Sequence, residues 1–166
     1  MQKDYPERKN IRLQKYDYNS NGAYFITICI KNGQMLLGTI EICPPVSNYV
    51  GTNCVRPLLS EIGTVIEKEL IILSNAYESV SVEKYVIMPN HIHMIIMITN
   101  GGRTQFVPTI SRIIKQFKGS ITKKLGTSIW QPRFYDRIIR SKEEYLRIWQ
   151  YIDENPARWT EDEYFV

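Results

Sequence analysis

The chain has 166 residues, 43% of them hydrophobic, and a formal net charge of +4. A chain of this length commonly folds as one domain, and this apolar content suffices for a core, so we expect a single domain over residues 1–166. The apolar run after His93 is too short to span a bilayer, the first residues lack a signal-peptide segment, and the three cysteines have no Cys-x-x-Cys spacing; we therefore expect a reduced, cytoplasmic protein without a membrane segment or a zinc knuckle.

The N-terminal third predicts an arm, two strands and a loop. Residues 1–22 are polar and read as an arm, whereas the aromatic and β-branched residues of 24–30 indicate a central strand. A turn at Asn32-Gly33 leads into 34–38, which we expect to complete a hairpin. The stretch 41–57 contains several prolines and glycines and reads as a loop insertion.

The middle of the chain predicts one helix and two strands. Apolar side chains recur at helical spacing from about residue 57 to residue 74, which indicates an amphipathic helix. They are Leu59, Ile62, Ile66, Leu70 and Leu73. Strands over 80–88 and 91–98 follow, joined by a tight turn at Pro89-Asn90.

The strand over 91–98 begins with the only two histidines of the chain, His91 and His93. Side chains on a strand alternate between its faces, so both imidazoles point the same way, and Ile92 points to the other face. Such a pair can supply two ligands of a divalent metal ion from one rigid element. The alternative is that one histidine is a hydrogen-bonded core residue and the other a surface residue.

Two further helices follow. The first opens near Pro108-Thr109 and buries an apolar stripe made of Ile110, Ile113, Ile114, Phe117 and Ile121. The last runs from about residue 142 to Asn155, before Pro156, and buries Tyr145, Ile148, Trp149 and Ile152. This order of elements indicates an α+β protein with a ferredoxin-like antiparallel sheet that helices cover on one face.

The charge is unevenly distributed. Between residues 103 and 140 there are nine basic residues and one acidic residue, Asp136. This basic field suggests a polyanion such as nucleic acid, while a solvated helix face with a basic loop explains it equally well. Within it, the segment 130–137 interleaves aromatic residues with arginines, which suits stacking on exposed bases, although Trp130 and Phe134 can equally anchor the core.

On the last helix, Tyr151 and Asn155 lie one turn apart, beside the buried stripe. A phenol and an amide oxygen can face one target from this position. The alternative is that Tyr151 is a half-buried aromatic residue and Asn155 simply ends the helix before Pro156.

Several segments together resemble a known family. His91-Ile92-His93 matches the histidine-hydrophobic-histidine signature of the HUH endonucleases, within the segment Met88–His93 in a form typical of single-tyrosine transposases. The resemblance covers nearly the whole chain and is closest to the REP-associated tyrosine transposases. Its other segments are Arg12–Tyr18, Gly22–Thr27, Trp130–Asp136 and Tyr151–Pro156.

The resemblance implies the HUH endonuclease fold, a nucleophile at Tyr151 and a divalent metal ion held by His91, His93 and Asn155. The implied reaction is attack of Tyr151 on a phosphodiester of hairpin-flanked single-stranded DNA, which forms a 5′-phosphotyrosine link and frees a 3′-hydroxyl for rejoining. A tyrosine with a pKa of about 10 is only roughly 0.1% ionised at pH 7, so the attack needs help from the metal. The mixed ligands admit Mg²⁺ or Mn²⁺, and the imidazoles favour Mn²⁺.

Single-stranded or hairpin DNA is the implied partner, and basic side chains are our candidates for contacts to its backbone. They are Arg8, Lys9 and Arg12 in the arm, and Arg112, Lys115, Lys118, Lys123, Arg133, Arg137 and Arg140 further on. Two alternatives stay open: a metal-dependent nuclease that uses water, and a non-catalytic protein that binds nucleic-acid hairpins. The REP-associated relatives resemble monomers and the insertion-sequence relatives dimers, so we expect a monomer and leave a homodimer open.

Overall fold

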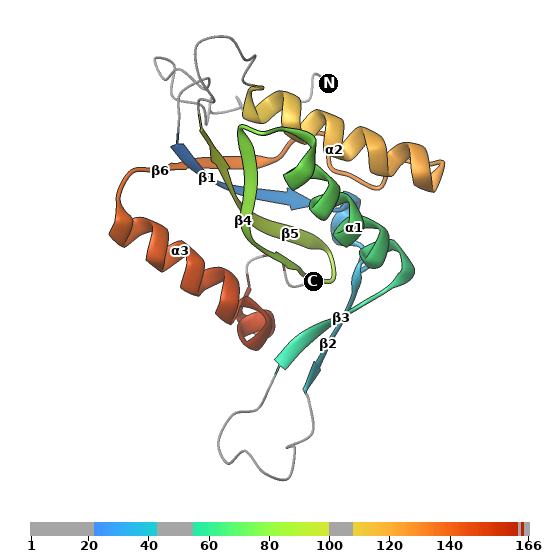
Figure 1. The fold of residues 1–166 in the computed structure, drawn as a ribbon. Coiled ribbons are helices and arrows are strands. Elements are labelled where there is room, and N and C mark those ends of the chain that lie inside the picture. The colour runs from blue at the N-terminus through green and yellow to red at the C-terminus, as the bar shows by residue number, and fades with distance from the viewer. Residues whose placement is uncertain (1–21, 43–54, 100–107, 163, 165–166) are drawn as a thin grey trace, which may run out of the picture.

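The computed structural model describes residues 22–42, 55–99, 108–162 and 164. Four strands form the central sheet in the order β4-β5-β1-β6, and each neighbouring pair is antiparallel. The strands are β1 (Gly22–Cys29), β4 (Val80–Ile87), β5 (His91–Ile98) and β6 (Tyr135–Ile139). The α-helices of the described residues are α1 (Glu61–Ala76), α2 (Ile110–Leu125) and α3 (Lys142–Glu154), as Figure 1 shows. The predicted arm, with Arg8, Lys9 and Arg12, lies outside the described residues.

Two βαβ units interleave in the sheet. The chain passes from β1 through α1 to β4, and from β5 through α2 to β6. In each unit the strand that lies between its two strands belongs to the other unit. This is the split βαβ arrangement of ferredoxin-like folds. The predicted α+β class with a ferredoxin-like antiparallel sheet is therefore confirmed.

Different helices cover the two faces of the sheet. The even-numbered side chains of β1 and β5 pack with α1 and α2; they include Tyr24, Ile26, Ile28, Ile92, Met94 and Ile96. The odd-numbered side chains pack with α3 in a second cluster, which includes Ala23, Phe25, Ile95 and Ile152. The prediction that helices cover one face holds for α1 and α2 but is wrong for α3, which lies across the sheet from them (Figure 1). Beyond its histidines, strand β5 carries apolar side chains on both faces of the sheet. Helices must therefore cover both faces.

A two-stranded ribbon lies between β1 and α1 in the chain. Strand β2 (Gly38–Ile42) pairs with β3 (Val55–Leu59), and neither strand joins the main sheet. The predicted loop over 41–57 is thus shorter than expected, because both of its ends lie in these strands. Residues 43–54 lie outside the described residues.

The predicted hairpin between 24–30 and 34–38 is wrong. The backbone of Leu37 bonds elsewhere: its N–H donates to the carbonyl oxygen of Pro89 at 2.9 Å, and its own carbonyl oxygen accepts from Ser60 N at 2.9 Å. The segment therefore crosses the β4–β5 turn instead of returning along β1. This crossing places the backbone after β1 beside the start of β5.

Side-chain caps set where the helices begin. An oxygen of Ser60, Thr109 or Ser141 accepts a hydrogen bond from the backbone N–H three residues later, at 3.1 to 3.3 Å. The predicted starts of the second and third helices are confirmed. The first begins at Glu61 rather than near residue 57, because 55–59 form β3. No helix in the described part of the chain has both the length and the apolar character needed to cross a membrane.

Helix α3 ends at Glu154 with Asn155 as its C-cap, so the prediction that the last helix ends before Pro156 is confirmed. A 3₁₀ helix, η2 (Asn155–Glu161), follows α3 directly and carries Pro156 at its start. Proline is tolerated there, because the first backbone N–H groups of a helix have no acceptor within the helix. Trp159 of η2 is buried in the same core as α3. This turn brings Asp162 close to His91 at the start of β5.

Candidate active site

His91 and His93 lie side by side at the start of β5, on the face that α3 covers. Their ring centroids are 4.4 Å apart, and both side chains are buried. Their cross-strand partners on β1 are Cys29 and Thr27. The prediction that both imidazoles share one face is confirmed, and neither histidine is a surface residue.

The neighbours of His91 fix which of its nitrogens carries the proton. Asn90 Nδ2 donates to the backbone oxygens of Tyr164 and Gly33, at 2.7 and 3.4 Å, so Asn90 Oδ1 is the atom that faces His91. That oxygen lies 2.9 Å from His91 Nδ1 and can only accept, so Nδ1 carries the proton. Nε2 of His91 therefore presents a lone pair, as a metal ligand must.

His93 is held from both sides of its ring. Its Nδ1 lies 2.8 Å from Thr27 Oγ1, and its Nε2 lies 3.2 Å from the hydroxyl oxygen of Tyr151. Phe25 stacks on the ring, with centroids 5.3 Å apart. When Nδ1 donates to the threonine oxygen, Nε2 is free to accept the tyrosine proton or to bind a metal ion.

Tyr151 reaches the histidines from α3. Its ring meets Phe25 edge-on at a centroid distance of 6.0 Å, and its side chain is 41% exposed. The hydroxyl is thus anchored at a buried histidine while part of the ring stays open to solvent. Tyr145 of the same helix instead packs against the core, as predicted.

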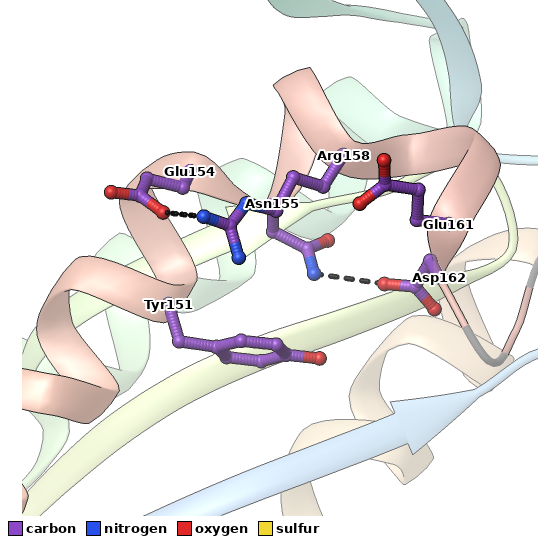
Figure 2. A pocket seen from close by; sticks show the side chains of 6 residues that line it. All are labelled: Tyr151, Glu154, Asn155, Arg158, Glu161 and Asp162. Carbon is purple, nitrogen blue, oxygen red and sulfur yellow. Dashed lines mark hydrogen bonds and ion pairs between the residues drawn. The ribbon is translucent and has the colours of Figure 1, made fainter.

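Asn155 and Asp162 complete the site. Asn155 Nδ2 donates to Asp162 Oδ2 at 2.8 Å, and this bond turns Asn155 Oδ1 the other way, where it is buried without a hydrogen-bond partner. Asp162 Oδ2 lies 4.0 Å from His91 Nε2. In Figure 2 the phenol of Tyr151, the amide of Asn155 and the carboxylate of Asp162 turn toward a common space.

Asp162 is the site residue that sequence reasoning missed. Its only signal was membership of an acidic C-terminal stretch, which also contains exposed carboxylates such as Glu161. Its place depends on the path of η2, which no local pattern predicts.

A cavity of about 370 Å³ adjoins the nucleophile candidate. Tyr151, Asn155 and Asp162 line it together with Glu154, Arg158 and Glu161 (Figure 2). Arg158 pairs with Glu154 at 2.9 Å across one helical turn. The site is therefore open to a ligand on the side of Tyr151.

Burial keeps both imidazoles neutral. It lowers the pKa of His91 to about 4, although the carboxylate of Asp162 acts in the opposite direction. Burial also lowers the pKa of His93, and the neighbouring His91 adds to this effect. Both rings are consequently in the form that binds metal ions at neutral pH.

The donor atoms present fit a divalent metal ion. Ligand atoms of His91, His93 and Asp162 all lie within 4.8 Å of one another. Among the described residues, His91 Nε2 and Asn155 Oδ1 are buried polar atoms without a hydrogen-bond partner, and such atoms are costly unless something binds them. An ion held by this cluster would satisfy His91 Nε2.

The predicted DNA-contact residues fall on two sides of the sheet. Arg112, Lys115 and Lys123 are exposed on α2, which covers the face away from the histidines. Arg137 is the cross-strand partner of Phe25, so it lies on the same face as Tyr151, where it pairs with Glu144 at 2.6 Å. Arg133 and Arg140 are exposed beside the two ends of β6.

Lys118, another predicted DNA contact, has a structural role as well. Its Nζ donates to the backbone oxygens of Gln131 and Arg133, each at 2.9 Å, and so holds the segment between α2 and β6 in place. Burial lowers the pKa of Lys118 to about 8, against an opposing effect of Cys29. Two of its three protons bond the main chain, and its role as a DNA contact stays a prediction.

No family model matches this chain, but several known proteins are similar to it. It is 31% identical over 180 residues to an uncharacterized protein of Haemophilus influenzae, covering 96% of this chain and 93% of that one. It is 32% identical over 77 residues to a REP-associated tyrosine transposase of Escherichia coli, which spans 46% of this chain and under half, 44%, of that protein. A solved structure of a REP-associated tyrosine transposase bound to a REP hairpin shares the fold, with a TM-score of 0.61 and 21% identity over 87% of this chain and 70% of that one. The chain is thus similar in sequence, over part of its length, to REP-associated tyrosine transposases, and it shares the fold of one of them over most of its length.

Proposed function

We propose that this protein is a metal-dependent transposase that cuts and rejoins hairpin-flanked single-stranded DNA through a covalent link to Tyr151. The observation that carries the proposal is the contact of 3.2 Å between the Tyr151 hydroxyl and His93 Nε2, beside two buried ligand atoms without partners. The transposase relatives support an enzyme that acts on DNA, and the solved relative with a REP hairpin supports hairpin DNA as the partner.

The proposed metal ligands are His91 Nε2, His93 Nε2 and Asn155 Oδ1. Asp162 orients the Asn155 amide through their hydrogen bond and adds a negative charge beside His91. Imidazole and oxygen donors together suit Mn²⁺, with Mg²⁺ as the alternative. When bound, such an ion polarises a non-bridging oxygen of the phosphodiester and neutralises the charge that develops there.

Tyr151 acts as the nucleophile in this proposal. Its Oη forms a bond to phosphorus while the bond from phosphorus to the 3′ oxygen breaks; the phenol loses its proton and the 3′ oxygen gains one. The 5′ phosphate stays on the tyrosine, and attack by a 3′-hydroxyl reverses the reaction and rejoins the strand. Thr27 orients His93 and Phe25 contacts the tyrosine ring, so the nucleophile is positioned before substrate arrives. His93 Nε2 holds the Tyr151 hydroxyl only while no ion occupies that lone pair, because one lone pair serves one partner.

Basic side chains on both sides of the sheet are the proposed contacts to the DNA backbone. Arg137, on the face that α3 covers, and Arg133 and Arg140 beside the ends of β6 are proposed backbone contacts, while Arg112, Lys115 and Lys123 offer a second basic surface on α2. A monomer in a cytoplasmic location stays the prediction from the sequence.

The test is a denaturing gel of protein incubated with Mn²⁺ and hairpin oligonucleotides taken from the flanks of its own gene. We expect a protein–DNA adduct with the natural chain and none with Tyr151→Phe. Tyr145→Phe is the matched control, because it removes a hydroxyl from the same helix outside the site. Cleavage without an adduct would favour a nuclease that uses water, and binding without cleavage would favour a non-catalytic hairpin binder.

A further inference from the structure

The aromatic residues of the segment 130–137 have different environments. Trp130 is buried, and its Nε1 donates to the backbone oxygen of Lys118 at 3.2 Å. Phe134 packs against the core on the side of α1 and α2. Tyr135, in contrast, is 40% exposed. Of the aromatic side chains that this segment interleaves with arginines, Tyr135 is the one available to a ligand.

Tyr135 lies in one row with the metal-site candidate. It begins β6, where it pairs with Thr27 of β1, and Thr27 in turn pairs with His93 of β5. Directly opposed residues of an antiparallel sheet share a face, so the side chains of Tyr135, Thr27 and His93 all stand on the face that α3 covers. Phe25 lies between the two tyrosines, with ring centroids 6.4 Å from Tyr135 and 6.0 Å from Tyr151.

The geometry leaves room for a base on the Tyr135 ring. Its plane and that of Phe25 meet at 70°, an edge-to-face contact that uses at most one face of the Tyr135 ring. Among the described residues, strand β6 is also the last strand of its sheet, and β1 is its neighbour there. A nucleic-acid strand can therefore approach along this edge.

The charge around Tyr135 suits a DNA backbone. Arg133 and Arg137 are exposed two residues before and after it, and Arg140 is exposed just beyond β6. An aromatic ring flanked by basic side chains is the arrangement that binds single strands, because bases stack on the ring and phosphates pair with the cations.

We propose that Tyr135 is the stacking platform for an unpaired nucleobase next to the phosphate that Tyr151 attacks. The proposal rests on the proposed function and adds the subsite that seats the single strand. The base must be unpaired, because both faces of a base within a duplex are already stacked. Stacking tolerates any base, so the platform requires that a base is present at this position and sets little preference for which base it is.

The test measures how tightly the metal-free protein binds a fluorescently labelled hairpin oligonucleotide with a single-stranded arm. Abasic sites replace the nucleotides of the arm one at a time. We expect one position at which the natural chain loses about five-fold or more in affinity. Tyr135→Ala should lose a similar factor on the intact oligonucleotide and nothing further at that abasic position, while Tyr135→Phe should bind as the natural chain does.

Leu146→Ala is the control, since it removes an exposed apolar side chain from α3 that the site does not use; it should change nothing. The proposal is overturned if the losses from Tyr135→Ala and from every abasic site simply add, or if Tyr135→Phe binds as weakly as Tyr135→Ala while keeping the natural melting temperature. The experiment needs no cleavage, so its failure is distinct from the absence of an adduct on the gel, which would contradict the proposed function.

Discussion

The hydroxyl oxygen of Tyr151 lies 3.2 Å from Nε2 of His93, although the two residues come from different elements, α3 and β5. This contact joins the histidine pair to the last helix. It also depends on α3 covering the face of the sheet opposite to α1 and α2.

Removing the His91 imidazole should abolish metal binding. We expect Mn²⁺ to raise the melting temperature of the natural chain, because an ion that binds only the folded state stabilises it, by about 2.7 kcal/mol at a concentration one hundred times its Kd. His91→Ala should show no such rise, since it lacks the buried Nε2. Thermal unfolding over a Mn²⁺ titration measures this effect.

Asp153→Asn is the control for that titration, because Asp153 is an exposed carboxylate on the same helix as Tyr151. It should respond to Mn²⁺ as the natural chain does. An unchanged response in His91→Ala would contradict the proposed ligand set.

Asp162 should tune the affinity for the metal through Asn155. In Asp162→Ala the Asn155 amide loses the acceptor of its Nδ2, and its Oδ1 is no longer held in place. We expect the Mn²⁺ affinity to fall by about 10- to 100-fold, as is usual when the partner of a metal ligand is removed. Calorimetric titration of Mn²⁺ gives the value. Glu161→Ala, which removes an exposed carboxylate from the same cavity, should cost much less, and equal losses would show a general charge effect instead.

Two glycines should respond oppositely to the same substitution. A Cβ on Gly63 of α1 would lie 2.1 Å from the backbone oxygen of Leu37, so Gly63→Ala should lower the free energy of unfolding by about 1–3 kcal/mol. A Cβ added at Gly119 of α2 would meet no described atom within 4 Å beyond its own helical turns, so Gly119→Ala should raise that free energy by about 0.5–1 kcal/mol. Urea unfolding distinguishes the two, and stabilisation by Gly63→Ala would contradict the packing of α1 against Leu37.

The stability that Lys118 contributes should grow with pH. Its pKa of about 8 in the folded chain lies below the ordinary value of 10.5, so the unfolded chain binds more protons between these values. Stability therefore rises with pH across this window. In urea unfolding, the gap between the natural chain and Lys118→Met should widen from about pH 8 to about pH 10.5. A constant gap would show that the Lys118 ammonium is not held in a buried environment.

Much of the framework of the site could be predicted from the sequence. The alternation of β5 placed both histidines on one face, and the helical stripe of α3 separated the packed Tyr145 from Tyr151. These predictions worked because each depends on the periodicity of a single element.

The parts that failed depend on contacts between distant segments. The hairpin after β1 did not form, because the backbone of Leu37 bonds Pro89 of the β4–β5 turn. Asp162 was missed, because its position is set by the burial of Trp159 and the path of η2. In both cases the local sequence is compatible with several paths, and the tertiary partner selects one of them.

The assignment of Tyr151 as the nucleophile is tested most directly by identifying which tyrosine carries the DNA. The chain has 11 tyrosines, and Tyr164 also lies near the proposed metal ligands, with its ring 4.6 Å from that of His91. Trypsin separates the two, since Ile148–Arg158 contains only Tyr151 and the following peptide contains only Tyr164. Mass spectrometry of the nuclease-trimmed adduct should find the nucleotide phosphate on Ile148–Arg158. Its attachment to the peptide of Tyr164, or to any other tyrosine, would contradict the assignment of Tyr151 as the nucleophile.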